Sequence, residues 1–326
     1  MNTNHMIKKT LETFLNNLTA STTVVVGYSG GVDSHVLLHA LAKLREAVSG
    51  LRLSAIHVNH HLQKEADVWV THCKRVGEQL NVPIQLVDVN VNPTKGESVE
   101  AAAREARYHV FAKHLPENAY LVTAHHQDDQ AETVLLQLLR GAGVKGLSAM
   151  PAIMPFSQGF LARPLLSVSQ EALVEYAKQQ SLSWVDDQSN QNLQYQRNFL
   201  RAKVMPLLKQ VRPAAVEAMS RSAQHCASAS ELLETLAAED LQQVKLDGKR
   251  LSAKKLKAFL PNRQANVMRY WLQLQGCVLP STVKMQHILQ DLIASRYDAK
   301  PEICWGGVKL QRLKDEILLK ENGPGS

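Results

Sequence analysis

Hydrophobic positions follow two alternating periods over the first 140 residues of the chain. Short apolar runs rich in β-branched residues are each followed by a longer stretch whose apolar residues recur three and four positions apart, as on one face of a helix. The runs occupy residues 22–26, 53–59, 82–91 and 119–126, and the helical stretches occupy 36–44, 64–80, 98–114 and 129–139. Strands that alternate with helices of this length predict an α/β fold with a doubly wound parallel sheet.

The middle of the chain has a less regular pattern. Residues 146–160 are rich in glycine and proline, which predicts turns in this stretch. A helix is expected over residues 167–180, with Ser167 or Ser169 as its N-terminal cap. A further helix is expected from residue 194 up to Pro206, because proline interrupts a helical pattern.

The character of the chain changes near residue 212. Residues 214–245 contain neither glycine nor proline, which predicts one long connecting helix. Further helices are expected at 252–259, 262–275 and 281–295, followed by a small antiparallel meander. We therefore divide the chain into an α/β domain, residues 1–211, and a long helix with a small, mainly helical α+β domain, residues 212–326.

The segment SGGVDS, residues 29–34, follows the first predicted strand and leads directly into a helix. Its two glycines permit positive φ and close backbone approach, and the helix start leaves N–H groups unpaired. Such a loop is a natural cradle for phosphate, although a glycine-rich turn that binds nothing is the alternative. The chain has no GxxxxGK[ST] motif, and no GxGxxG follows this strand. The candidate nucleotide-binding residues are Ser29, Gly30, Gly31, Val32, Asp33 and Ser34.

Polar loops after the second and fourth predicted strands open on the same edge of the sheet, where ligands of such sheets bind. His57 and His125 are candidates to line a nucleotide pocket there. Asp129 and Glu132 lie three residues apart at a helix start and share one face. Such carboxylates suit Mg²⁺ with phosphates or a substrate ammonium group, and Asp33 and Asp129 are the candidate Mg²⁺ ligands. Asp-x-x-Glu at a helix start is also a capping box.

Two pairs of arginines occur at helical spacing. Arg104 and Arg107 lie three residues apart, and Arg197 and Arg201 lie four apart near the domain boundary. Guanidinium groups at such positions neutralise phosphate or stabilise negative charge that develops in a transition state. Ion pairing with acidic neighbours at the surface is the ordinary alternative.

Charge is unevenly distributed along the chain. The net charge is +7, but residues 1–200 carry 17 basic and 18 acidic side chains, whereas residues 201–326 carry 20 and 12. A basic module beside a neutral one predicts a polyanionic partner, although a solvated lysine-rich surface accounts for the charge equally well. The four cysteines form no CxxC pair, and no run of 18 apolar residues occurs, so we expect a soluble, cytoplasmic protein without membrane contact.

Seven segments stand out in order along the chain: SGGVDS, HVNHHL, AREARYHVF, TAHHQDDQAETVLLQLLRGAGVKGL, RPLL, WVDDQSN and YQRNFLR. Together they resemble the signatures of the tRNA(Ile)-lysidine synthases, a family of the PP-loop, or N-type ATP pyrophosphatase, superfamily. The resemblance is dense over about residues 22–205. Two departures are noted: Ala149 stands where the family is expected to have glycine, and the second C-terminal domain of longer members is not expected in this sequence.

This resemblance implies an adenine nucleotide α-hydrolase-like fold and an enzyme that uses ATP and Mg²⁺ to adenylate the wobble cytidine of an isoleucine tRNA with a CAU anticodon. Free L-lysine then displaces AMP to form lysidine, after pyrophosphate has been released. The loop 29–34 would bind ATP, and the basic domain would bind tRNA. Homodimer formation is left open. Catalytic or binding roles are implied for Asp33, Asp129, Glu132, Arg104, Arg107, Arg197 and Arg201.

Two other functions stay open. A PP-loop 2-thiolase acting on tRNA usually needs paired cysteines, which the chain lacks. A nucleotide-binding or tRNA-binding protein without catalysis is the second alternative, and the combination of acidic and basic candidates counts against it.

Overall fold

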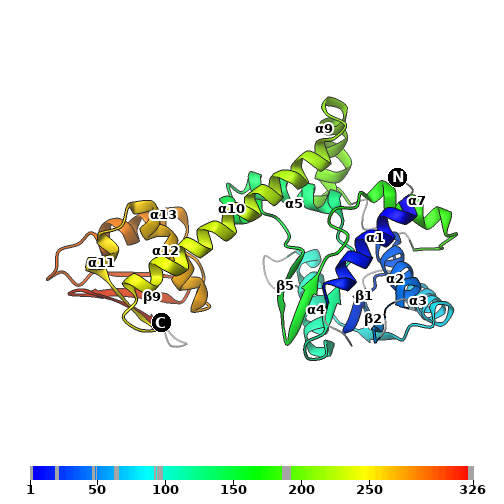
Figure 1. Cartoon of the computed structure of the whole chain (residues 1–326), viewed down its shortest axis with the longest axis horizontal. Helices are drawn as coiled ribbons and strands as arrows, with labels where there is room; N and C mark the ends of the chain where they lie inside the picture. Colours follow the sequence, from blue (N-terminus) through cyan, green and yellow to red (C-terminus); the bar gives the residue numbers. More distant parts are fainter. Residues whose placement is uncertain are drawn as a thin grey trace. The chain divides into compact units, whose positions relative to one another are not determined.

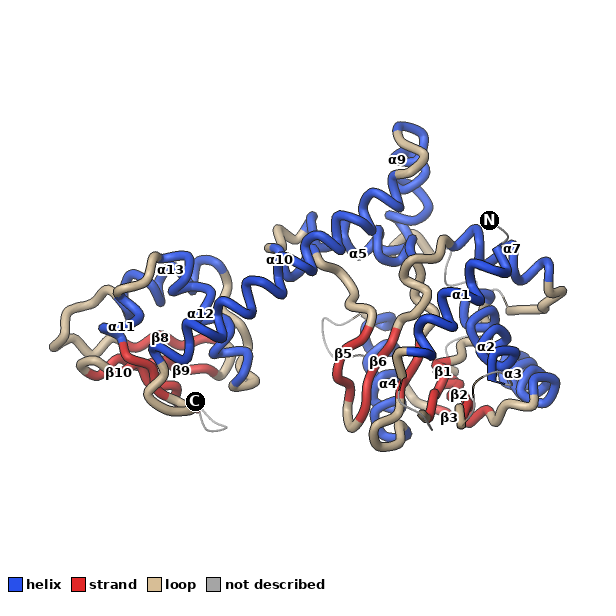
Figure 2. Tube along the Cα trace, in the orientation of Figure 1, coloured by secondary structure: helices blue, strands red, loops and turns tan. Residues whose placement is uncertain are grey.

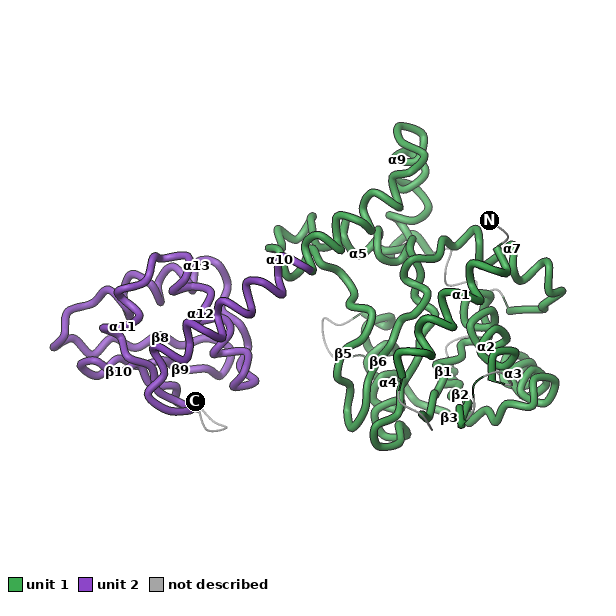
Figure 3. The backbone as a smooth tube through the Cα atoms, viewed as in Figure 1, with its two compact units in different colours: residues 1–227 green, residues 228–326 purple. Residues whose placement is uncertain are grey.

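The computed structural model describes residues 3–18, 22–45, 48, 50–61, 66–91, 93, 98–185 and 192–321. The chain divides into two compact units, residues 1–227 and 228–326 (Figure 3). The division falls inside one helix, α10 (Ala215–Val244), whereas the boundary expected from sequence lies at 211/212, just before that helix. No helix among the described residues is long and apolar enough to cross a membrane.

The first unit is built on a six-stranded sheet with the order β3-β2-β1-β4-β6-β5 (Figure 2). All neighbouring strands are parallel except β5, which pairs antiparallel with β6 at one edge. The strands are β1 (Thr23–Gly27), β2 (Arg52–Asn59), β3 (Ile84–Asp88), β4 (Tyr120–Val122), β5 (Ile153–Phe156) and β6 (Gly159–Ala162). The expected parallel sheet is thus confirmed, and the order in which successive strands join it reverses between β1 and β4.

Helices cover both faces of this sheet, as a doubly wound fold requires (Figure 1). On one face, Val24 and Val26 of β1 belong to a core that includes residues of α1, α2, α3 and α7. On the other face, Val25 packs with Phe111 of α4. The alternation of side chains along β1 supplies both cores. The helices are α1 (Thr3–Asn16), α2 (Val32–Arg45), α3 (Ala66–Leu80), α4 (Val99–His114), α5 (Gln127–Leu139), α6 (Val144–Leu147) and α7 (Gln170–Gln179), which Ser169 caps.

The turn prediction for residues 146–160 is wrong in part, because β5 and the start of β6 lie there. Pro155 is tolerated because β5 is an edge strand, where a missing N–H costs little. Gly159 is required by close packing: an added Cβ would lie 2.2 Å from the backbone oxygen of Ala119. The glycine and proline that suggest turns therefore serve an edge hairpin.

The helix expected to stop at Pro206 instead continues beyond it. The segment consists of α8 (Gln196–Phe199), the π-helical turn η2 (Leu200–Val204) and α9 (Met205–Val211). Pro206 occupies the first turn of α9, a position at which helices tolerate proline.

The second unit combines helices with a four-stranded antiparallel sheet of order β7-β10-β9-β8. Its core surrounds the fully buried Trp271, so the expected α+β domain is confirmed. The expected helix 252–259 is shorter, because β7 takes its first residue. The elements are β7 (Arg250–Ser252), α11 (Ala253–Lys257), α12 (Pro261–Leu274), α13 (Thr282–His287), η3 (Ile288–Ile293), β8 (Glu302–Trp305), β9 (Val308–Leu313) and β10 (Glu316–Glu321).

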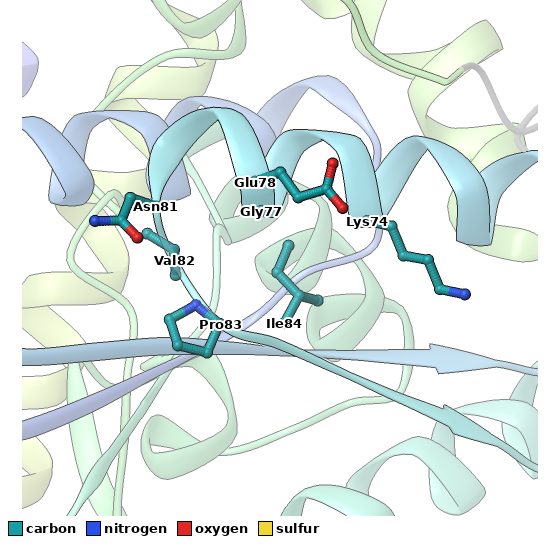
Figure 4. Close-up of a pocket in the computed structure, with 7 residues that line it drawn as sticks. All are labelled: Lys74, Gly77, Glu78, Asn81, Val82, Pro83 and Ile84. Carbon is teal, nitrogen blue, oxygen red and sulfur yellow. The ribbon is translucent and has the colours of Figure 1, made fainter.

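A shallow hollow of about 350 Å³ lies between the end of α3 and the start of β3 (Figure 4). Gly77 lets the helix approach the strand closely, since an added Cβ would lie 2.9 Å from Ile84 Cγ1. The hollow is at the amino-terminal ends of the parallel strands. Ligands of such sheets bind at the opposite edge, so we look for the site there.

Ala149 has a φ of +55°, in the left-handed region that favours glycine. Because an L side chain there costs about 1 kcal/mol or more, we expect Ala149→Gly to raise the free energy of unfolding by about 0.5–1 kcal/mol. The matched control is Ala112→Gly inside α4, which should lower it by about 1 kcal/mol. Urea unfolding gives the free energy of unfolding of both variants. If Ala149→Gly lowered it as much as the control does, the backbone at Ala149 would not be strained.

Candidate active site

The loop between β1 and α2 is closed on itself by its own side chains. Ser34 Oγ donates to the Gly31 carbonyl at 3.0 Å and lies 3.0 Å from Ser29 Oγ. Gly30 has a φ of +88°, and α2 starts with the bond from His35 N–H to the Gly31 carbonyl at 3.0 Å. A preformed loop with an open helix N-terminus suits a phosphate group.

The back of this loop rests on buried polar side chains. His57 Nδ1 lies 3.0 Å from the Tyr28 carbonyl, and burial lowers the pKa of His57. The Gly30 carbonyl accepts the Val185 N–H at 3.1 Å. Cys73 Sγ lies 3.5 Å from where a Gly30 Cβ would stand. The structure thus places His57 underneath the loop, where it holds the backbone that precedes Ser29.

Four charged side chains form what we name the arginine–carboxylate cluster: Asp129 and Glu132 of α5, Arg197 of α8 and Arg201 of η2. Arg197 Nε donates to Glu132 Oε2 at 2.7 Å, and Arg201 Nε donates to Glu132 Oε1 at 2.6 Å. Both arginines also donate through Nη2 to Asp129 Oδ1 at 3.1 Å. Glu132 is 1 % exposed and Asp129 is also buried, whereas the side chains of Arg197 and Arg201 are 25 % and 35 % exposed, so two buried negative charges face two partly exposed positive ones.

The capping alternative for Asp129 and Glu132 is resolved by the position of the helix start. The N-cap residue of α5 is His126, and Asp129 Oδ2 accepts the His126 backbone N–H at 3.0 Å. Asp129 therefore caps the helix with one oxygen and binds arginine with the other, whereas Glu132 binds only arginine. Burial opposes ionisation of Asp129, but the neighbouring His126 and Arg197 side chains prevail and hold its pKa below the ordinary value.

His126 connects the loop after β1 with the arginine–carboxylate cluster. Its Nε2 lies 3.4 Å from Asp129 Oδ2 and 3.7 Å from Asp33 Oδ2. Asp33 Oδ1 is buried without a hydrogen-bond partner among the described residues, and burial raises the pKa of Asp33. The carboxyl ends of β1 and β4 thus bring Asp33, His126 and Asp129 into one crevice.

His125 and the α4 arginines lie around this crevice with weaker connections to it. Thr123 Oγ1 lies 2.8 Å from His125 Nδ1, and burial lowers the pKa of His125 to about 3, so its ring is neutral. Arg107 Nε donates to His60 Nε2 at 3.4 Å. Arg104 is exposed, lies over the Tyr108 ring at 4.9 Å, and forms no ion pair with a described carboxylate. Surface ion pairing therefore does not account for Arg104.

Sequence reasoning did not select His126 and Asp128, although both stand in the HHQDD run. Asp128 Oδ2 accepts the Gln170 N–H at the start of α7, at 2.9 Å, and its Oδ1 lies 3.3 Å from Lys209 Nζ. Asp128 thereby fixes α5 against α7 and α9. The position of His126 directly before the helix start was the available signal. Residues 186–190 of the segment WVDDQSN lie outside the described residues.

Comparisons with known proteins decide the family. A model of the PP-loop domain matches residues 3–208, and a model of the TilS substrate binding domain matches residues 251–318. The tRNA(Ile)-lysidine synthase of Coxiella burnetii is 42% identical over 94% of this chain and 68% of its own length. That of Histophilus somni is 39% identical over 94% of this chain and 72% of its own length. The chain belongs to the tRNA(Ile)-lysidine synthase family.

The chain spans about two thirds of the length of such relatives, since the enzyme of Yersinia pseudotuberculosis, 42% identical, is covered over 66%. A solved U34-tRNA thiolase from Methanococcus maripaludis has a TM-score of 0.57 and 16% identity, with 68% of this chain and 79% of that chain covered. That likeness shows the fold alone. In this lysidine synthase family member, all candidate site residues lie within the PP-loop match.

Buried and exposed ion pairs of the chain should respond differently to the same substitution. Glu132→Gln leaves two arginines facing one carboxylate, so we expect the free energy of unfolding to fall by about 3 kcal/mol. The control is Glu217→Gln, which removes an exposed pair with Arg221 at 3.1 Å and should cost less than about 1 kcal/mol. Urea unfolding followed by tryptophan fluorescence measures both, and equal losses would contradict the importance of burial.

Stability should also fall in mild acid, because burial lowers the pKa of His35 and of His39 to about 4. Their contribution is complete above the ordinary value of 6.5 and is lost as pH falls from 6.5 towards 4, since only the unfolded chain then takes up protons. Between pH 7 and pH 5 we expect a loss of about 1–2 kcal/mol for each histidine. Urea unfolding at a series of pH values gives the slope of the free energy of unfolding against pH for the wild type and for His39→Gln. The two slopes should differ by the equivalent of about one proton, and equal slopes would contradict the assigned role of His39.

Proposed function

We propose that the chain ligates lysine to C2 of the wobble cytidine of isoleucine tRNA with a CAU anticodon. The cytidine O2 attacks the α-phosphorus of ATP and pyrophosphate leaves; the lysine ε-amine then attacks C2, loses a proton, and AMP leaves. One observation carries this proposal. His126 Nε2 lies 3.7 Å from Oδ2 of Asp33, in the loop at residues 29–34, and 3.4 Å from Oδ2 of Asp129, in the arginine–carboxylate cluster. An ATP site beside a site for a charged second substrate is what this two-step reaction needs.

The loop at residues 29–34 is proposed to hold the phosphates of ATP. Its open helix N-terminus and the N–H groups near Gly30 supply donors for the pyrophosphate that leaves. His57 supports the loop from behind, and His125 remains a proposed nucleotide contact. Because His125 is neutral, it serves as a hydrogen-bonding group without adding charge.

Mg²⁺ is proposed to bind through Asp33. The buried Asp33 Oδ1 has no hydrogen-bond partner among the described residues, so it fits a cation, whereas both oxygens of Asp129 already accept hydrogen bonds. A bound Mg²⁺ would neutralise the phosphates and assist departure of pyrophosphate. Asp129 would join it only after release of an arginine. Mg²⁺ usually binds one or two protein carboxylates together with substrate phosphates, so Asp33 and the ATP phosphates are sufficient ligands.

The arginine–carboxylate cluster is proposed to recognise lysine. An amino acid presents an ammonium and a carboxylate together, and a cluster with two guanidinium groups and two carboxylates offers a partner to each. Asp129 and Glu132 would receive the ammonium, and Arg197 with Arg201 the carboxylate. Without lysine the four side chains neutralise one another, as their hydrogen bonds of 2.6–3.1 Å describe.

The tRNA is proposed to contact both parts of the chain. Residues 1–211 would form the catalytic domain with Arg104 and Arg107 at its rim, and residues 212–326 the basic tRNA-binding domain. The match of residues 251–318 to a substrate binding domain supports the latter. The same proposal places the reaction in the cytoplasm, where its tRNA substrate is found. Formation of a homodimer stays a prediction.

A thiolase function is less well supported. The sequence has no CxxC pair, and among the described residues no group of three His, Cys, Asp or Glu side chains is arranged to hold a metal ion. A binding protein without catalysis would have no need for the buried cluster of four charges beside Asp33.

Mass spectrometry of nucleosides from tRNA treated with ATP and lysine tests the proposal. We expect a cytidine that has gained the mass of lysine minus water. Asp129→Asn should lower the rate about 100-fold, because it weakens a contact to substrate charge, whereas the exposed Glu117→Gln should leave it unchanged. Full lysine incorporation by Asp129→Asn would remove the assigned role, and no mass gain with the wild type would remove the function.

A further inference from the structure

Arg163 is a buried cation without an acidic partner. It is 5 % exposed, and no described carboxylate lies within ion-pair distance. Its Nη1 donates to the Pro151 carbonyl at 2.8 Å, while its Nε is buried without a hydrogen-bond partner among the described residues. Buried charges in proteins are normally paired, so this one calls for an explanation.

The side chain lies at the edge of the sheet where the site is. Arg163 directly follows β6, the parallel neighbour of β4, and so stands beside the loop that carries His125. The positive charges of Arg163, Arg197 and Arg104 act together with burial to lower the pKa of His125. Three arginines thus act on His125 against one carboxylate, that of Asp129.

Tyr108 of α4 connects Arg163 with Arg104. The Arg163 guanidinium interacts electrostatically with the Tyr108 side chain, and the Arg104 guanidinium lies over the Tyr108 ring at 4.9 Å. The ring also packs edge-on against Phe156 of β5 at 5.9 Å between centroids, which fixes its orientation. Tyr108 thus neighbours both an exposed arginine and a buried one.

We infer that Arg104, Tyr108 and Arg163 form a phosphate site that takes the phosphodiester group next to the target nucleotide. Arg104 is the residue that touches the phosphate. Arg163 is a positioning residue, which orients Tyr108 and supplies a second positive charge beneath it. This inference rests on the proposed function, and it assigns the position of the RNA backbone relative to the crevice.

A phosphodiester fits better than the carboxylate of lysine. The arginine–carboxylate cluster already offers two guanidinium groups to one carboxylate, so the second pair of arginines exceeds what lysine needs. A base that enters a crevice brings its flanking phosphates to the rim, where the exposed Arg104 lies. Bracing of the hairpin explains the bond from Arg163 to Pro151, but it does not explain the unpaired charge.

Binding of an anticodon stem-loop RNA, measured against salt concentration with the full chain, tests the inference. We expect Arg104→Gln to weaken RNA binding about 3- to 10-fold. The slope of the logarithm of the binding constant against the logarithm of the salt concentration should fall in magnitude by about one. Arg163→Met should do the same, whereas Arg163→Lys, which keeps the charge, should retain the slope. The control is Arg52→Gln, the same loss of charge at the exposed amino-terminal end of β2, which should change neither. The KM for lysine should stay within about twofold in all variants.

Each other result has a defined meaning. A raised lysine KM with unchanged RNA binding would assign these arginines to the lysine carboxylate and overturn the inference. If Arg104→Gln changes neither RNA binding nor the KM for lysine, Arg163 only stabilises the β5–β6 hairpin and the inference is wrong. Arg104→Gln tests the inference alone if Arg163→Met does not fold. Absence of RNA binding by the wild type would contradict the proposed function itself, so the two failures are distinguishable.

Discussion

The buried cluster of Asp129, Glu132, Arg197 and Arg201 is the interaction on which the rest of the site depends. It ties α5 to the segment that follows α7, with Glu132 almost completely buried between two guanidinium groups. Breaking such a buried pair by removing one partner is costly, so the cluster fixes the geometry of the crevice. The same two arginines and two carboxylates are also suited to bind the carboxylate and the ammonium group of an amino acid in place of one another. The residues that stabilise the site would then also recognise the substrate.

The sheet topology explains why these residues meet the loop at residues 29–34. The chain order reverses between β1 and β4, so the loops after these strands open on a shared crevice. Asp33 enters it from the start of α2, and His126 and Asp129 enter it from the start of α5. Two helix N-termini at one point make the crevice favourable for phosphate as well.

Periodicity predicts the first four strands, β1 to β4, and their helices because both are local patterns, and the parallel sheet follows from their alternation. The β5–β6 hairpin escapes this reasoning, since Gly159 is required by a contact with Ala119 that is distant in sequence. For the site, spacing selects Asp129 and Glu132 but does not reveal that arginines saturate them. His126 stands directly before a helix start, which local sequence can indicate, but its approach to Asp33, and the contact of Arg163 with Pro151, involve residues distant in sequence that no local pattern reveals.

Pyrophosphate release tests most directly whether the loop after β1 directs cleavage of ATP between the α and β phosphates for transfer to tRNA. We expect AMP and pyrophosphate in equal amounts, with multiple turnovers only when the CAU isoleucine tRNA and lysine are both present. Release that is independent of tRNA, or formation of ADP and phosphate instead, would contradict it.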